Sequence, residues 1–279
     1  MNPISQAYYD AHAEDFRHPW RLWVEPFRIF GNLYFVGNAD GASHLLDTGA
    51  GLVLFDSNYP TATPLLLYAI WRLGFSLADL RMIFHTHGHF DHFGATELLT
   101  RLTGAQTVLG EGDARMFRER PELTLREPDT YMWCPLFEPD ITVSDGDVIR
   151  VGETEITAVD TAGHSPGAMS YFFPVTDGAR TLTAVLHGGA GFNTLTRAFE
   201  REYRVSGARE AFYASIQRLK ARQADIFLGN HTAQSRTLEK HARQLAPDCP
   251  ANPFVDRGQW PAYLASLEAQ LEQLERDDP

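Results

Sequence analysis

Cysteine is scarce in this chain of 279 residues, which contains only Cys134 and Cys249. The two lie far apart and match no metal-ligand spacing, so we expect two free thiols in a reducing compartment, with a single disulfide as the alternative. No stretch approaches the roughly 20 apolar residues that a membrane span needs. The first residues also lack the basic start, apolar run and small-residue cleavage site of a secretory signal. These absences predict a cytoplasmic protein with no membrane segment.

Positive charge is also in short supply. The chain carries 24 Lys and Arg against 36 Asp and Glu, which gives a net charge of -12. An acidic surface without a Lys/Arg cluster repels phosphate backbones, and this argues against a nuclease or any other nucleic-acid partner. Hydrophobic content of 44% is ordinary for a globular protein and sufficient for a full core. A small-molecule substrate is therefore the expected partner.

Composition changes once near the N-terminus. Residues 1–23 are polar and aromatic and predict one short helix, which we interpret as an N-terminal extension. This extension packs either on the main body or on a second subunit, in which case the protein is a homodimer. Residues 24–279 carry the periodic apolar pattern of a single domain.

From residue 24 onward, short apolar runs broken by Gly, Asn and Asp predict strands. The predicted strands are 27–30, 33–36, 44–47, 52–55, 82–85, 106–109, 141–143, 147–151, 155–160, 169–174, 181–187 and 225–228. Helical spacing predicts helices at 63–73, 95–102, 112–119, 208–222 and 260–276. This order gives two halves, each a sheet with outer helices. It predicts an α/β fold in the form of a four-layer αββα sandwich.

One loop concentrates metal-binding side chains. The segment FHTHGHFDHFG (84–94) places His87, His89, Asp91 and His92 within six residues, directly after an apolar strand. Alternate residues of an extended loop point the same way, so the first two histidines can reach one ion. Asp91 and His92 fall where the chain turns into the next helix and can reach a second ion. Imidazole and carboxylate are ligands that Zn²⁺ prefers.

Two later histidines also follow apolar strands. His164 lies in the turn TAGHSPG (161–167), and His231 lies in DIFLGNHTAQS (225–235). Either alone is more often a surface or structural histidine than a ligand. Together with the first loop, His164 completes a three-histidine site with one position open, the arrangement of a catalytic zinc. His231 would complete the ligands of the second ion.

These motifs together make the chain similar to the metallo-β-lactamase superfamily, and most similar to the third subclass of metallo-β-lactamases. The likeness covers roughly residues 24–277, including VEPFRIFGNLYFVG (24–37) and the closing helix. It implies the metallo-β-lactamase fold and two zinc ions per chain. By this resemblance His87, His89 and His164 bind the first zinc, and Asp91, His92 and His231 bind the second. Asp56, at a strand end, corresponds to an Asp that supports the ligand loop.

The segment AVLHGGAGFN (184–193) departs from most of the superfamily. Gly189 falls where a metal-bridging Asp is usual, and the third subclass also lacks that Asp. Gly189 and Gly191 stand where this subclass usually has serines that help bind the β-lactam carboxylate. His187 nearby is an extra ligand, a support for a ligand, a substrate contact, or a strand-end histidine with an ordinary partner. Asn193 could donate to a substrate carbonyl, although a turn residue needs no such role.

The predicted function is hydrolysis of an amide or ester-type carbonyl bond. Two zinc ions lower the pKa of a water between them, and this water attacks the carbonyl as zinc-bound hydroxide. Asp91 orients the nucleophile and passes a proton. β-Lactams are the substrates that the resemblance implies. The alternatives are a cytosolic lactone, thioester or amide hydrolase with the same site, an iron-dependent oxidoreductase on the same fold, and a non-catalytic binding domain.

Residues 1–23 and 111–140 are the expected walls of the substrate pocket, because loops over a rigid scaffold set specificity. Within the second range, Tyr131, Met132, Trp133 and Phe137 form an apolar group. Those side chains either cover the substrate or anchor a long loop to the core.

Overall fold

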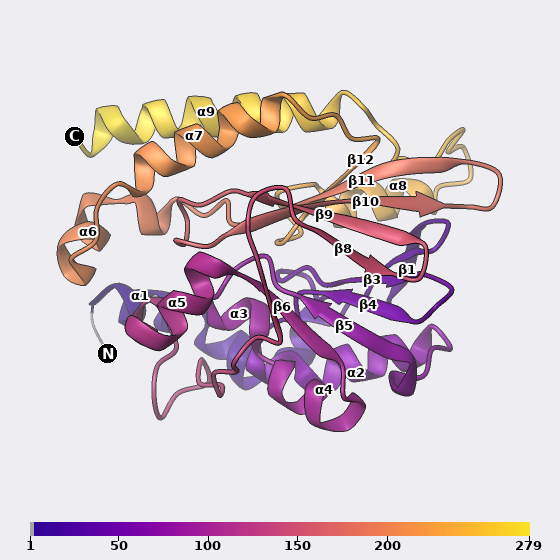
Figure 1. Ribbon diagram of the computed structural model, residues 1–279, viewed down its shortest axis with the longest axis horizontal. Helices are drawn as coiled ribbons and strands as arrows, with labels where there is room; N and C mark the ends of the chain where they lie inside the picture. Colours follow the sequence, from indigo (N-terminus) through magenta and orange to yellow (C-terminus); the bar gives the residue numbers. More distant parts are fainter. Residues whose placement is uncertain (1–2) are drawn as a thin grey trace.

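The apolar runs of the first half of the chain pair into one seven-stranded sheet (Figure 1). The computed structural model describes residues 3–279. The sheet has the order β1 (Phe27–Phe30), β2 (Leu33–Phe35), β3 (His44–Asp47), β4 (Leu52–Phe55), β5 (Leu80–Phe84), β6 (Gln106–Gly110) and β7 (Ile141–Val143). The first four strands are antiparallel, and the pairs from β4 to β7 are parallel.

A second sheet of five strands forms from the later part of the chain. Its strands are β8 (Val148–Val151), β9 (Thr154–Asp160), β10 (Met169–Thr176), β11 (Thr181–His187) and β12 (Ile226–Gly229). Strands β8 to β11 form an antiparallel meander, and β12 pairs with β11 in parallel. The carboxyl ends of β11 and β12 therefore lie at the same edge, with His187 opposite Gly229.

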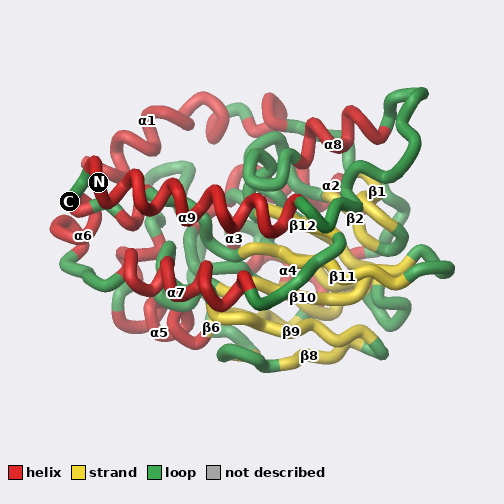
Figure 2. The backbone as a smooth tube through the Cα atoms, turned by 90° about the horizontal axis from the view of Figure 1, so that it is seen from above, coloured by secondary structure: helices red, strands yellow, loops and turns green. Residues whose placement is uncertain are grey.

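Helices cover the outer face of each sheet, as the four-layer prediction requires. The nine α-helices of the described chain are α1 (Pro3–Arg17), α2 (Thr63–Arg72), α3 (Phe90–Phe93), α4 (Thr96–Thr103), α5 (Glu111–Glu119), α6 (Arg197–Tyr203), α7 (Ala208–Lys220), α8 (Thr237–Gln244) and α9 (Gln259–Asp277). In Figure 1, α2 and α4 lie below the seven-stranded sheet, and α7 and α9 lie above the five-stranded one. Figure 2 shows α7 and α9 side by side. The αββα prediction is confirmed.

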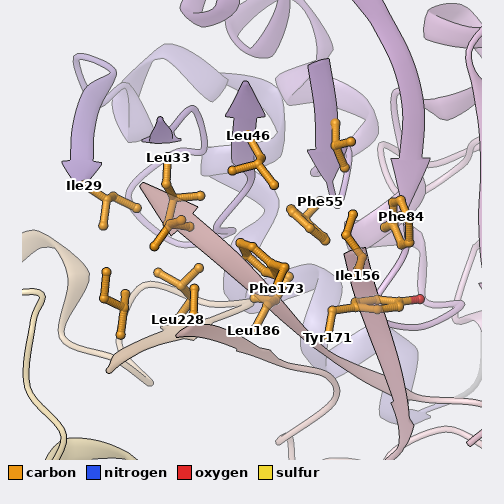
Figure 3. Packing of buried hydrophobic residues seen from close by; sticks show 14 of the residues in the cluster. Ile29, Leu33, Leu46, Phe55, Phe84, Ile156, Tyr171, Phe173, Leu186 and Leu228 are labelled. Atoms are coloured by element: carbon orange, nitrogen blue, oxygen red, sulfur yellow. The ribbon is translucent and has the colours of Figure 1, made fainter. Parts of the chain in front are cut away.

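The two sheets pack face to face through large apolar side chains (Figure 3). The rings of Phe55 on β4 and Phe173 on β10 stack with centroids 4.5 Å apart. Tyr171, also on β10, is fully buried and donates its hydroxyl to the backbone carbonyl of His85 at 2.9 Å. The core between the sheets thus reaches up to the loop that carries the histidines.

The N-terminal extension lies against the body of the chain. Phe16 of α1 is buried in a cluster with Tyr59, Phe90 and Phe93, and Tyr8 of the same helix packs against this cluster. Residues 1–2 of the extension fall outside the described range. Packing on the main body is thus one observed role of this segment, while contact with a second subunit stays a prediction.

The cysteines and the helices bear on two expectations from composition. Cys134 and Cys249 are both free thiols, as predicted, and Cys134 is buried. Among residues 3–279, none of the helices combines the length and the apolar character that a membrane span requires.

Removing a ring from the contact between the sheets should be costly. We expect Phe173→Ala to lower the free energy of unfolding by about 3–5 kcal/mol, because the side chain is buried and leaves a cavity. Urea denaturation followed by circular dichroism measures this change. Trp71 on α2 is 67% exposed, and Trp71→Ala should change stability by at most about 0.5 kcal/mol. Equal costs for the two variants would contradict the assigned core.

Candidate metal centre

All six predicted ligands come from loops at one edge of the two sheets. His87 and His89 follow the buried end of β5, and Asp91 and His92 belong to the short helix α3 directly after them. His164 lies in the turn between β9 and β10, and His231 follows β12 by two residues. The sequence reasoning therefore grouped side chains that the fold does bring together.

These six residues form two groups with metal-ligand spacing. One group is His87, His89 and His164, and the other is Asp91, His92 and His231. Within each group one potential ligand atom per residue lies within 4.8 Å of the others. The two groups are adjacent, since the ring centroids of His87 and His92 are 4.1 Å apart. The arrangement could hold two metal ions side by side.

In the three-histidine group, protein acceptors hold the outer ring nitrogens of His87 and His164. Nδ1 of His164 is 2.8 Å from the carbonyl oxygen of Gly191, so this nitrogen carries the proton and Nε2 keeps its lone pair. Nε2 of His164 lies 3.0 Å from Nδ1 of His89. Nδ1 of His87 is 3.0 Å from the hydroxyl of Thr86, which itself donates to Asp56 and so accepts from the ring. One nitrogen of each ring therefore converges on a common point.

In the second group, carboxylates hold the outer nitrogens. Nδ1 of His92 is 2.7 Å from Oδ2 of Asp56, and Nδ1 of His231 is 3.3 Å from Oδ1 of Asp40. The inner nitrogens, Nε2 of each ring, lie 3.2 Å and 3.3 Å from Oδ2 of Asp91. Such carboxylate–histidine pairs fix the tautomer and orientation of a metal-binding imidazole.

The electrostatics differ between the groups. Burial holds the pKa of His87 and His89 well below the ordinary histidine value and lowers the pKa of His164 to about 4, so all three rings are neutral at pH 7. Burial acts in the same direction on the second group, but Asp91 and Asp56 outweigh it and raise the pKa of His92 to about 9. The second group therefore lies in a negative potential that favours a cation.

Buried nitrogens without partners outside their own groups also indicate that this donor set suits metal ions. Nε2 of His87 is buried and has no hydrogen-bond partner among the described residues, and Nε2 of His92 is buried with only the ion-pair contact to Asp91 of its own group. An unsatisfied buried nitrogen is costly in a folded protein unless another ligand satisfies it. Both atoms belong to the two groups, and neutral imidazole with carboxylate is a donor set suited to zinc.

Asp56, predicted to support the ligand loop, is 1% exposed and has a left-handed backbone conformation with φ of 55°. One of its oxygens accepts from the backbone N–H of Thr86 at 2.7 Å, and the other accepts from the Thr86 hydroxyl and from His92. Its carboxylate thereby ties β4 to both halves of the ligand loop.

Sequence reasoning missed a second buried carboxylate, Asp113 at the start of α5. It accepts from the backbone N–H of Gly88 at 2.6 Å, the hydroxyl of Ser165 at 2.7 Å and the backbone N–H of Gly167 at 2.7 Å. Burial raises the pKa of Asp113 to about 6 against the effect of these donors. Asp113 thus joins the loop of His87 and His89 to the turn of His164.

A cavity of about 220 Å³ opens over both groups. Its walls include Ile4, Ser5 and Tyr8 of α1, and Leu125 and Met132 of the long segment after α5. These residues fall within the two ranges predicted as pocket walls. The predicted apolar group divides accordingly: Met132 is buried and Phe137 is half-buried in the same cluster, whereas Tyr131 and Trp133 are exposed.

Asn193 and His187, the remaining predicted residues, lie in different surroundings. Asn193 lines the cavity. His187 is buried at the end of β11, does not line that cavity, and has Tyr263 of α9 as its partner, with Nδ1 3.2 Å from the hydroxyl. This contact matches the alternative of a strand-end histidine with an ordinary partner. Gly189 has φ of 71°, and a Cβ there would lie 3.0 Å from Cβ of His164, so the bend itself favours glycine.

Removing Asp113 should loosen both ligand loops. Asp113→Ala leaves two backbone N–H groups and a hydroxyl without their acceptor, at about 1–3 kcal/mol each. We expect the free energy of unfolding, measured by urea denaturation, to fall by about 3 kcal/mol or more. Asp140 is a matched control, because it is exposed and accepts from Thr107 at the opposite end of β6. If Asp140→Ala costs as much, the linking role of Asp113 is wrong.

The comparisons with known proteins agree with this geometry. The family model described as the metallo-beta-lactamase superfamily matches residues 36–181. Among solved structures, BJP-1, a subclass B3 metallo-beta-lactamase of Bradyrhizobium japonicum, superposes with a TM-score of 0.82 and 30% identity, covering 92% of this chain and 96% of that one. FEZ-1 from Legionella gormanii gives a TM-score of 0.79 and 26% identity, covering 91% and 96%.

A hydroxyacylglutathione hydrolase of Cereibacter sphaeroides is 28% identical over 191 residues, which is 68% of this chain. The match spans 62% of the length of that relative. None of these relatives is an oxidoreductase, so the iron-dependent alternative gains no support. The family match, the shared fold and the two ligand groups lead to one conclusion: the chain belongs to the metallo-β-lactamase superfamily.

Proposed function

We propose that this protein is a hydrolase that uses two zinc ions to cleave an amide, lactam or ester-type carbonyl bond. The observation that carries the proposal is the pair of adjacent ligand groups opening onto one cavity. His87, His89 and His164 would hold the first ion, and Asp91, His92 and His231 the second. Bound there, divalent zinc supplies a Lewis acid for the carbonyl and lowers the pKa of water.

The side chains of this chain supply orientation and proton transfer. Although burial disfavours its charge, His92 and His231 hold the pKa of Asp91 well below its ordinary value, so it is an ionised acceptor beside the cavity. In the proposed reaction Asp91 orients the attacking water, accepts its proton and returns a proton to the leaving atom. Asn193 lies at the cavity wall, where its amide could donate to a substrate carbonyl.

Two substrate classes follow from different relatives. The two solved structures that this protein matches over 96% of their length are metallo-beta-lactamases, and this favours β-lactams. Glycines at 189 and 191 provide no side chain to bind a β-lactam carboxylate at the position predicted for it. The hydroxyacylglutathione hydrolases favour a thioester. We place β-lactam hydrolysis first and a glutathione thioester second.

Metal content and turnover test the proposal together. We expect two zinc ions per chain by elemental analysis of the purified protein, and nitrocefin hydrolysis that chelation abolishes and added zinc restores. Zinc without nitrocefin turnover, but with chelator-sensitive cleavage of a hydroxyacylglutathione, would support the second substrate class. Iron in place of zinc, or full activity of metal-depleted protein, would contradict the mechanism.

Substitutions should separate the two ions. Asp91→Asn removes the carboxylate that serves the second ion and the proton transfer, so kcat should fall by about 10²-fold or more and the zinc content should fall from two toward one. His89→Ala should lower both turnover and retention of the first zinc. His18, a histidine outside both groups, gives the control, and His18→Ala should keep wild-type zinc content and kcat.

A further inference from the structure

A second cavity, of about 410 Å³, lies beside the one over the metal groups. The two cavities share His89 and His164, and no residue of the group Asp91, His92 and His231 lines the larger one. The larger cavity therefore branches from the three-histidine side of the centre. Its size is within the usual range for small-molecule sites.

The walls of the larger cavity are mostly apolar. They come from α5, α6 and the start of α7, which lie at the same end of the molecule in Figure 1, together with the segments after α5 and α6 and the turn of His164. The apolar wall residues are Met116, Leu123, Phe199, Val205, Ala208 and Ala211. Burial of alkyl or aryl groups against such walls is favourable without any directional contact.

The polar groups in the interior of this cavity already have partners. The Ser165 hydroxyl donates to Asp113 at 2.7 Å, and the Thr194 hydroxyl is 3.0 Å from Nδ1 of His164. Arg120 bonds Glu122 and the backbone carbonyl of Tyr203. The exposed rim carries Arg115 and Glu119, whose opposite charges cancel. A neutral apolar group fits this interior better than a polar or charged one.

The smaller cavity has a mixed lining, with Ile4, Leu125 and Met132 on its apolar side. Besides the metal groups it is lined by Asn193, Asn230 and Gln234. Oδ1 of Asn230 is buried and has no hydrogen-bond partner among residues 3–279. Asp91 and His231 line this cavity and not the larger one, so the polar part of a ligand finds its partners on this side.

We propose that the substrate is an acyl compound whose neutral alkyl or aryl acyl group occupies the larger cavity, while its polar leaving group occupies the smaller one. The scissile carbonyl then lies at His89 and His164, where the cavities meet. This inference rests on the proposed hydrolase function and deepens its thioester and ester alternatives, because the nitrogen of a hydrolysed β-lactam stays joined to the acyl product.

Binding of straight-chain carboxylates, the products of such a reaction, tests the assignment without turnover. We titrate butanoate, hexanoate and octanoate into the zinc-loaded protein by calorimetry. Affinity should rise about fourfold per methylene, as expected for burial of an alkyl chain. Affinity that does not depend on chain length would overturn the assignment, and this result needs no variant that might fail to fold.

Two tryptophan variants on α7 locate the binding. Ala211→Trp fills the larger cavity and should remove the dependence on chain length, reducing octanoate affinity at least tenfold. Ala214 is exposed on the same helix and does not line the cavity, so Ala214→Trp should retain the wild-type series. Equal behaviour of the two folded variants, verified by circular dichroism, would contradict the site.

The two proposals fail in different ways. Chain-length-dependent binding without turnover of any acyl substrate would reject the hydrolase function and keep the cavity assignment. Turnover with the same KM for short and long acyl groups would keep the hydrolase function and reject the cavity assignment.

Discussion

The buried carboxylates of Asp56 and Asp113 hold the ligand loop in place between the two sheets. Asp56 accepts from Thr86 and His92 at the two ends of the loop, and Asp113 accepts from Gly88 near its middle. The loop is extended and buried, so its backbone N–H groups cannot be satisfied by a regular ladder or by water. The two carboxylates provide acceptors instead, and Asp113 also fixes the turn of His164 through Gly167.

This support gives the two ligand groups different charge. The three-histidine group is neutral, because burial disfavours imidazolium and its outer nitrogens contact a hydroxyl and a carbonyl. The second group contains Asp91 and is flanked by Asp40 and Asp56. A divalent cation in the first group meets neutral donors, whereas one in the second meets carboxylates at short range. Negative charge therefore increases from the side of the larger cavity toward the second ligand group, which borders the smaller cavity.

Sequence predicted the parts of this structure that depend on local patterns. The runs at 52–55 and 82–85 became β4 and β5 within two residues, because strands buried on both faces are continuously apolar. The grouping of the six ligands followed from their density after apolar strands. Asp113 and Asp40 could not be recognised, because only the fold brings them to His87's loop and to His231. The short helices α6 and α8 were missed, since such helices depend on tertiary packing more than on propensity.

The bend at Gly189 bears on how a site of this kind can change over time. A carboxylate shared between two ions would need a side chain at that position, yet the backbone there is left-handed and His164 lies against it. An aspartate introduced at position 189 would strain the backbone and crowd His164, so the substitution is unfavourable unless the loop changes as well. Diversification is then expected to proceed through the walls of the two cavities, while the ligand set stays constant.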